Sequence, residues 1–162
     1  MTVNDSAPPN VVPWPPLVLT ATALLAIALG RLLPLAALDG LWPTTIGMAT
    51  LLAGIALDLW AIMTMRRANT NIMPNRAADL LVTWGPFRFS RNPIYLANTL
   101  LLIGIGLAYG NSWFVAGGFL SAMIVDRLAI RREERHLAAR FGADWTAYAA
   151  KTPRWLLLGA GQ

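Results

Sequence analysis

Long apolar runs separated by short polar segments dominate the amino-acid sequence. Four such runs span roughly residues 17–38, 44–65, 94–109 and 113–130. A helix needs about 20 mostly apolar residues to cross a bilayer, and the first two runs reach that length while the later two come close to it. The pattern predicts an all-α integral membrane protein with about four transmembrane helices.

The composition agrees with a membrane location. Hydrophobic residues make up 56% of the 162 residues, charged residues make up 13%, and the mean hydropathy is +0.52. Soluble domains carry about 25% charged residues, and a chain this short cannot bury so much apolar surface in its own core. We therefore expect a single multi-pass membrane domain over residues 1–162.

Two polar segments flank the first two runs. Residues 1–16 are rich in proline and predict a flexible N-terminal tail before the first two spans, at 17–65. Residues 66–92 are interrupted by Gly85 and Pro86, which prevent one continuous helix. Non-helical backbone at membrane depth is tolerated only where it is buried in protein or lines a water-filled cavity. We therefore predict an interfacial loop before the third span, with a pocket beside it.

After the fourth run, the chain becomes charged and fits an amphipathic C-terminal helix. Glu133, Leu137 and Phe141 recur every four residues and so share one face. Glu134 lies about 100° further around the helix. We therefore predict that Glu133 points inward and Glu134 toward solvent. Gly142 is predicted to end this helix.

Paired glycines predict close contact between the third and fourth spans. Gly104 and Gly106 lie on one span, and Gly117 and Gly118 lie on the other. Small residues let two transmembrane helices approach closely. We expect these glycines to form the interface of a helical hairpin, with its turn at 110–112.

Charge distribution indicates an orientation. The net charge is +5, and of the 13 Lys and Arg residues all but Arg31 lie within 66–91 or 127–154. Positive charge beside apolar spans is typical of cytoplasmic loops. We therefore place both termini and the active site in the cytoplasm and predict no nucleic-acid partner. Because the chain has no cysteine and one histidine, we predict no metal site.

Three charged residues are candidates for contact with a substrate, namely Asp58, Arg88 and Arg127. Asp58 lies inside the second span, where a carboxylate is costly enough to suggest a function. The alternative is that Asp58 pairs with an arginine or accepts hydrogen bonds between helices. Arg88 has the alternative role of an anchor for lipid headgroups.

Two sequence motifs carry a resemblance to a known family. The first is LVTWGPFRFSRNPIY, which leads into the third span, and the second is EERHLAARFGADWTAY followed by PRW. In this order and at these separations, they resemble integral-membrane methyltransferases typified by isoprenylcysteine carboxyl methyltransferase. The related phospholipid methyltransferases share the later part of the pattern. The resemblance covers about Asp79 to Trp155.

The resemblance implies that residues 66–155 enclose S-adenosyl-L-methionine near the cytosol. The implied activity is methyl transfer to a lipophilic acceptor that enters from the bilayer. Candidate catalytic residues are Arg91, Asn92 and Tyr95. Glu133 is expected to accept hydrogen bonds from the ribose hydroxyls, as an ionised carboxylate does readily. The full set of implied cofactor contacts is Asp79, Leu80, Leu81, Val82, Phe87, Asn92, Pro93, Ile94, Tyr95 and Glu133.

Two positions depart from the isoprenylcysteine methyltransferase pattern. Asn92 stands where that family usually carries histidine, and an asparagine side chain cannot take up a proton. Ala129 aligns with an arginine thought to hold the substrate carboxyl group. Both departures argue against a prenylcysteine substrate. The acceptor group is left open between a carboxylate, a thiol and an amine, on a lipophilic small molecule or a lipidated substrate.

Two other functions fit the same residues. One is an NADPH-dependent membrane reductase of related architecture. The phosphate groups of NADPH could be bound by four arginines, Arg88, Arg91, Arg131 and Arg132. The other is a non-enzymatic helical protein that binds lipid or a partner. The expected partner is the lipid bilayer. The first two spans are rich in Ala and Gly and could pack against another copy of the chain to form a homo-oligomer.

Overall fold

The apolar runs of the sequence form helices, as predicted. The computed structural model describes residues 12–35, 38–70 and 80–156, and every regular element within these ranges is helical. The elements in chain order are α1 (Trp14–Leu32), α2 (Leu41–Arg67), η1 (Gly85–Arg88), α3 (Pro93–Ala108), α4 (Ser112–Val125), η2 (Asp126–Ile130) and α5 (Arg131–Lys151).

The helices have the lengths of a membrane protein. Within the described ranges, α1, α2 and the helical stretch Ser112–Lys151, which is kinked at Gly142, are long and apolar enough to cross a bilayer. α3 is equally apolar but has only 16 residues, which rise about 24 Å. A hydrocarbon core is about 30 Å thick, so α3 is short for a full crossing. The prediction of an all-α membrane protein is confirmed.

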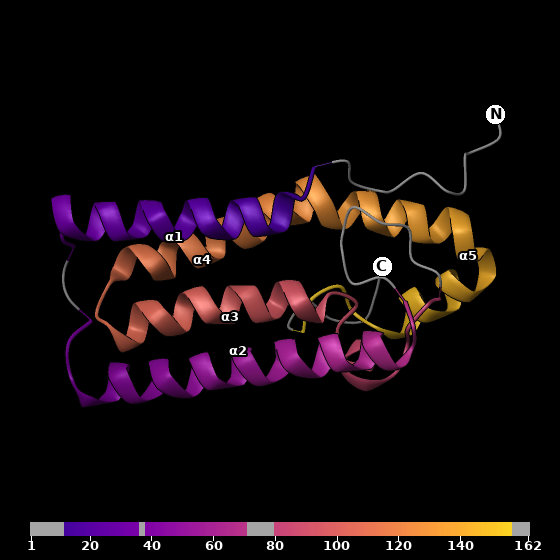
Figure 1. Cartoon of the computed structure of the whole chain (residues 1–162), viewed down its shortest axis with the longest axis horizontal. Helices are drawn as coiled ribbons and strands as arrows, with labels where there is room; N and C mark the ends of the chain where they lie inside the picture. The colour runs from indigo at the N-terminus through magenta and orange to yellow at the C-terminus, as the bar shows by residue number, and fades with distance from the viewer. Residues whose placement is uncertain (1–11, 36–37, 71–79, 157–162) are drawn as a thin grey trace.

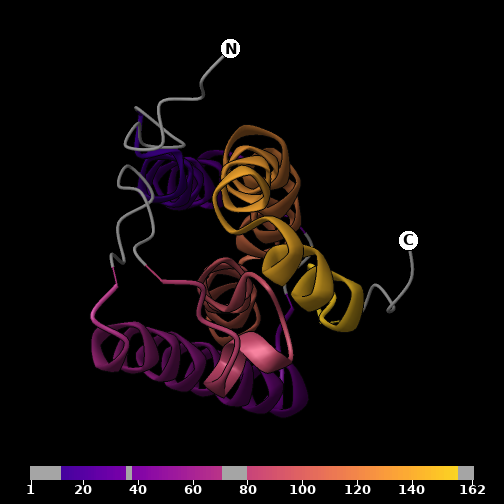
Figure 2. The ribbon, with the colours of Figure 1, turned by 90° about the vertical axis from the view of Figure 1, so that its right-hand side faces the viewer.

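The four apolar helices do not pack in the order of the chain. α2 packs along α3, α3 along α4, and α4 along α1, so α1 and α2 lie on opposite sides of the molecule (Figure 1). The view along the helices shows the same separation (Figure 2). The homo-oligomer predicted through the first two spans would therefore need two separate surfaces.

Glycines bring the α2 and α3 backbones into direct contact. A Cβ atom added at Gly104 would lie 2.6 Å from the Leu51 nitrogen, and one added at Gly47 would lie 2.3 Å from the Ala108 nitrogen. Such distances leave no room for a methyl group, so only glycine permits this packing. Van der Waals contact between backbones is the main attraction available to helices whose outer faces are as apolar as lipid.

The glycine prediction was wrong for two of four positions. Gly106 and Gly118 do lie between α3 and α4, but Gly104 faces α2. Gly117 faces Thr22 on α1 instead. The reason is that α3 and α4 each have two helical neighbours, and small residues close together on one helix contact different neighbours.

A π-helical segment joins the last membrane helix to the charged helix after it. η2 carries the chain from α4 into α5 without a break in the helix. At Gly142 the backbone leaves helical geometry, with φ +51° and ψ −117°, and the rest of α5 turns back toward α3 (Figure 1). The predicted end of the first amphipathic segment at Gly142 is confirmed. A positive φ is strained for other residues, which explains a glycine there.

Most of the charged residues lie at one end of the bundle. The C-terminal end of α2, η1, the start of α3 and all of α5 lie together (Figure 1), whereas Arg31 lies in the last turn of α1, at the other end of the bundle. α1 begins at Trp14, three residues earlier than predicted, because Pro15 and Pro16 fit the first turn of a helix. The molecule thus has an apolar half and a polar end.

We predict that Gly104→Ala destabilises the bundle by about 1–3 kcal/mol, the usual cost of overpacking, because the added methyl group meets rigid backbone of α2. Gly117→Ala is the matched control, since its methyl group would meet only the Thr22 side chain. Thermal unfolding in detergent measures both. Equal midpoints for the two variants would contradict the importance of the α2–α3 backbone contact.

Candidate functional site

The site begins with the loop of residues 80–92, which follows the end of α2. Gly85 has φ +63°, and a Cβ atom there would lie 2.7 Å from the Thr64 hydroxyl oxygen. Gly85 therefore allows both the turn and the close contact with α2. Pro86 and Ser90 are fully buried. The loop is thus built into the protein as the sequence pattern predicted, while residues 71–79, including Asp79, lie outside the described residues.

The start of α3 contacts the start of α5. The Tyr95 hydroxyl donates a hydrogen bond of 2.7 Å to Oε1 of Glu133. This contact places Glu133 on the face of α5 that points toward α3, as its helical spacing predicted. η2, just before Glu133, is a π-helix, a feature that frequently occurs at functional sites.

Glu134 contradicts the prediction that it points to solvent. Its side chain is 12% exposed and pairs with Arg91 at 3.4 Å and with Arg154. The C-terminal residues 152–156 fold back to bring Arg154 against this second face of α5. α5 therefore has two covered faces, and the helical periodicity of α5 alone indicated only one.

Arg154 is the centre of an ion-pair cluster. Its Nε donates to both oxygens of Glu134 at 3.0 and 3.1 Å, and its Nη1 lies 3.5 Å from Asp126. Asp126 also accepts a hydrogen bond of 2.9 Å from Arg131. The hydrogen bonds to Glu134 raise the pKa of Arg154, which therefore keeps its charge at any physiological pH.

The C-terminal segment also holds the 80–92 loop through its backbone. The Arg154 carbonyl oxygen accepts hydrogen bonds from the Ser90 hydroxyl at 3.1 Å and from the Asn92 amide at 3.4 Å. The Arg91 backbone N–H donates to the Pro153 carbonyl at 2.9 Å. The buried Asn92 side chain thus contacts the C-terminal segment.

A cavity lies between the 80–92 loop, the end of α2 and α5. It has an inner volume of about 90 Å³ and about 400 Å³ of empty space when its open mouth is included. Five of the predicted site residues line it, and five others complete it. The lining residues are Met65, Thr70, Leu80, Leu81, Val82, Phe87, Arg91, Leu137, Trp145 and Tyr148.

Aromatic side chains order the cavity wall. The Tyr148 hydroxyl donates a hydrogen bond of 2.6 Å to the Phe87 carbonyl oxygen, which joins α5 to the loop. The Trp145 ring packs edge-on against Tyr148, with centroids 5.8 Å apart. The Arg91 guanidinium lies over the Trp145 ring, 5.7 Å from its centroid. Burial raises the pKa of Tyr148, so its hydroxyl stays protonated as a donor.

Sequence reasoning did not assign Trp145 and Tyr148 to the site. Their spacing of three residues places them on one face of a helix, which was an available signal. The sequence predicted the break at Gly142 but not its direction, which turns this face toward the 80–92 loop.

The remaining predicted cofactor residues that the structure describes do not line this cavity. Tyr95 lines a second hollow of about 10 Å³ between α1, α3 and α4, beside the polar side chains of Asn98, Thr99 and Ser121. Pro93 is fully buried. Pro93, Asn92, Ile94 and Glu133 line neither hollow.

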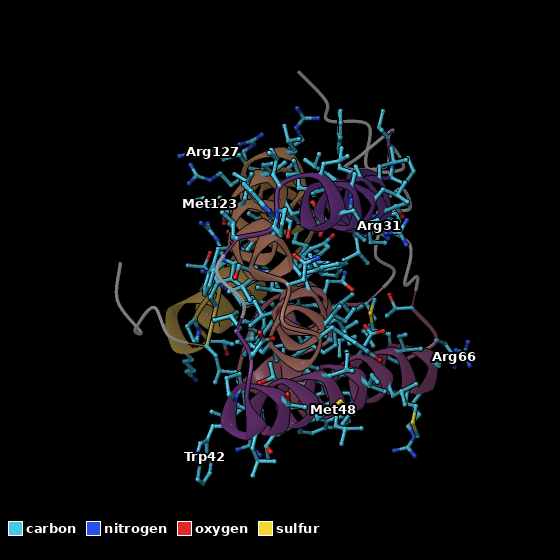
Figure 3. All side chains as sticks on the ribbon, turned by 90° about the vertical axis from the view of Figure 1, so that its left-hand side faces the viewer. Arg31, Trp42, Met48, Arg66, Met123 and Arg127 are labelled. Atoms are coloured by element: carbon cyan, nitrogen blue, oxygen red, sulfur yellow. The ribbon has the colours of Figure 1, made fainter. Side chains whose placement is uncertain are left out.

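The three candidate substrate contacts are not brought together. Arg88 is exposed and lies 5.3 Å from the Phe89 ring centroid. Arg127 is exposed on the outer side of the helix that joins α4 to α5 (Figure 3). Asp58 is half-buried in α2, and none of the three lines either hollow.

Comparison with known proteins places this arrangement in a family. A family model described as phospholipid methyltransferase matches residues 42–144. Two similar proteins are the cobalt-zinc-cadmium resistance protein CzcN of Cupriavidus metallidurans, 28% identical over 71% of this chain and 51% of that protein, and the nickel-cobalt-cadmium resistance protein NccN of Alcaligenes xylosoxydans xylosoxydans, 28% identical over 67% of this chain and 47% of that protein.

A third similar protein, uncharacterized, comes from Haemophilus influenzae and is 33% identical over 39% of this chain and 100% of its own length. The chain spans about half the length of the two resistance proteins. No solved structure matches it. The match to the family model runs from the start of α2 to just beyond the kink in α5 and covers more than half of the 162 residues. The chain therefore belongs to the phospholipid methyltransferase family, as its two motifs predicted.

Proposed function

We propose that the protein transfers a methyl group from S-adenosyl-L-methionine to a lipophilic acceptor at the cytoplasmic face of a membrane. The cavity between the 80–92 loop and α5 is the observation that carries this proposal. Its wall includes Leu80, Leu81, Val82 and Phe87, four of the residues that the family resemblance assigns to the cofactor.

The cavity suits a molecule that is partly aromatic and partly polar. Its inner volume of about 90 Å³ is below the usual 300–1,000 Å³ of small-molecule sites, so a bound molecule of the cofactor's size would extend into the open mouth. Phe87, Trp145 and Tyr148 offer flat apolar surface, and Arg91 offers a cation at the same wall. When bound, S-adenosyl-L-methionine supplies a methyl group that is already activated by its sulfonium.

The residues of this site are suited to binding and alignment. The cavity wall is mostly apolar, and the Tyr148–Phe87 and Asn92–Arg154 hydrogen bonds hold the loop in one position. Alignment of reactants in a dry site contributes much of the rate in such displacements. Asn92 cannot accept a proton, so we propose an acceptor that reacts as an anion, such as a carboxylate or a thiolate.

The orientation of the protein follows from its charge. We propose that the polar end faces the cytoplasm, because Arg66 and Arg67 at the end of α2 lie there together with the arginines of the 80–92 loop and α5. The chain is then a multi-pass protein whose acceptor reaches the site from the bilayer.

Two relatives are named for resistance to metal ions, but we propose methyl transfer as the role of this chain. The sequence has no cysteine and one histidine, and no group of three or more histidine or acidic residues able to hold a metal ion occurs in the part of the chain that the structure describes. Metal ions of this kind prefer imidazole and thiolate ligands.

The proposed function is tested by ligand-dependent thermal stability in detergent. We expect S-adenosylhomocysteine to raise the unfolding temperature, because a ligand that binds only the folded state stabilises it by mass action. NADPH at the same concentration is expected to have no effect. Stabilisation by NADPH alone would favour the reductase, and a response to neither ligand would favour a non-enzymatic lipid- or partner-binding protein.

Two neighbouring acids are expected to behave differently when each is changed to glutamine. Glu133→Gln should weaken S-adenosylhomocysteine binding about tenfold or more, because we assign the ribose hydroxyls to the Glu133 carboxylate and the change removes its charge. Glu134→Gln should instead lower the unfolding temperature, because it leaves Arg91 and Arg154 without their shared partner.

Calorimetric binding and thermal unfolding, each on both variants, separate the two effects. If Glu133→Gln binds as tightly as the unchanged protein, the assignment of the ribose to Glu133 is wrong. If Glu134→Gln keeps its unfolding temperature, the ion-pair cluster does not hold the polar end together.

A further inference from the structure

The cavity contains one polar group whose bonding is incomplete. Arg91 Nε is buried and has no hydrogen-bond partner among the described residues. Arg91 is a lining residue of the cavity, and its side chain is only 16% exposed. A buried donor without an acceptor is costly, by about 1–3 kcal/mol and more for a charged group. Such a group needs an explanation, and a bound ligand is one.

The charge of Arg91 is also incompletely balanced. The cluster around it contains three cations, Arg91, Arg131 and Arg154, but only two acids, Asp126 and Glu134. Arg154 takes three hydrogen bonds to Glu134, whereas Arg91 has a single contact of 3.4 Å with it. Of the two cations that share Glu134, Arg91 is therefore the more weakly paired, and it is the one that reaches the cavity.

The wall beside Arg91 limits what else the ligand can present. Apart from Arg91 and Thr70, the cavity is lined by apolar and aromatic side chains, and the Tyr148 hydroxyl is already used by Phe87. An anionic group in this cavity would thus be directed to Arg91, since a guanidinium binds a carboxylate with strong, charge-assisted hydrogen bonds.

We infer that Arg91 binds the carboxylate of the cofactor's amino-acid portion and is a specificity-determining residue of the cofactor site. This inference rests on the proposed function, because S-adenosyl-L-methionine carries a single anionic group, that carboxylate. Arg91 thus selects ligands that carry an anion at this end. Trp145 and Glu134 hold its guanidinium in place, through ring contact at 5.7 Å and the ion pair at 3.4 Å.

The inference is tested with two ligands that differ by one group. Calorimetry on the full chain in detergent measures Kd for S-adenosylhomocysteine and for its decarboxylated analogue, which lacks only the carboxylate. The unchanged protein is expected to prefer S-adenosylhomocysteine about tenfold to a hundredfold, the range for a hydrogen bond to a charged group. Arg91→Gln should remove this preference while leaving the affinity for the analogue unchanged.

Two further variants control the measurement. Arg91→Lys keeps the charge but loses the forked donor, and an intermediate preference is expected. Arg135→Gln removes an exposed cation from α5 and should leave both affinities unchanged. Binding of the analogue by Arg91→Gln shows that this variant is folded. If Arg91→Gln does not fold, the carboxylate assignment is decided by Arg91→Lys and by the preference of the unchanged protein.

The outcomes separate the inference from the proposed function. If the unchanged protein binds S-adenosylhomocysteine but Arg91→Gln keeps the preference for it, or weakens both ligands equally, the carboxylate assignment is wrong and the proposed function stands. The same holds if the unchanged protein shows no preference between the two ligands. If it binds neither, the proposed function and the inference both fail.

Discussion

The polar end of this protein depends on one set of ion pairs, those between Arg154 and the acids Glu134 and Asp126. They join the C-terminal segment to Asp126, at the start of η2, and to Glu134, in the first turn of α5. The side chains of both acids are largely buried. Charges in such a place must be paired, because an uncompensated buried charge costs several kcal/mol. The position of the C-terminal segment is therefore determined by where its guanidinium finds carboxylates.

The same residue also positions the 80–92 loop. The ion pairs of the Arg154 side chain hold its backbone in place, and its carbonyl oxygen accepts hydrogen bonds from Ser90 and Asn92. The loop in turn presents Phe87 to Tyr148 on the second half of α5. Three segments far apart in the sequence thus hold one another through these hydrogen bonds and ion pairs. The helices below them are held differently, by backbone contact through glycine, and the cavity lies where the two kinds of packing meet.

The sequence was sufficient for whatever depended on local pattern. Apolar runs located the helices to within three residues, except that α1 ends at Leu32, six residues before the predicted end of the first span. The spacing of Glu133 placed it correctly toward α3. Leu80 and Phe87 proved to line a cavity because the loop that carries them is built around Gly85, visible in the sequence. These features needed no knowledge of distant segments.

What could not be predicted depended on partners far along the chain. Glu134 is covered because residue 154 returns to it, and the Asn92 amide is engaged by the same segment, 62 residues away. Which helix Gly104 contacts depends on which helices flank α3. Periodicity within one helix indicates which face is buried only when that helix has one neighbour.

The order of the helices has a consequence for how the protein is made. The α3–α4 hairpin lies between α1 and α2, so the two helices synthesised first have no contact surface until the later pair arrives. In particular, Gly47 and Gly54 of α2 face positions on α3 that do not yet exist when α2 leaves the ribosome. The bundle can therefore assemble in the bilayer only when the α3–α4 hairpin inserts between α1 and α2, which are in the membrane before it.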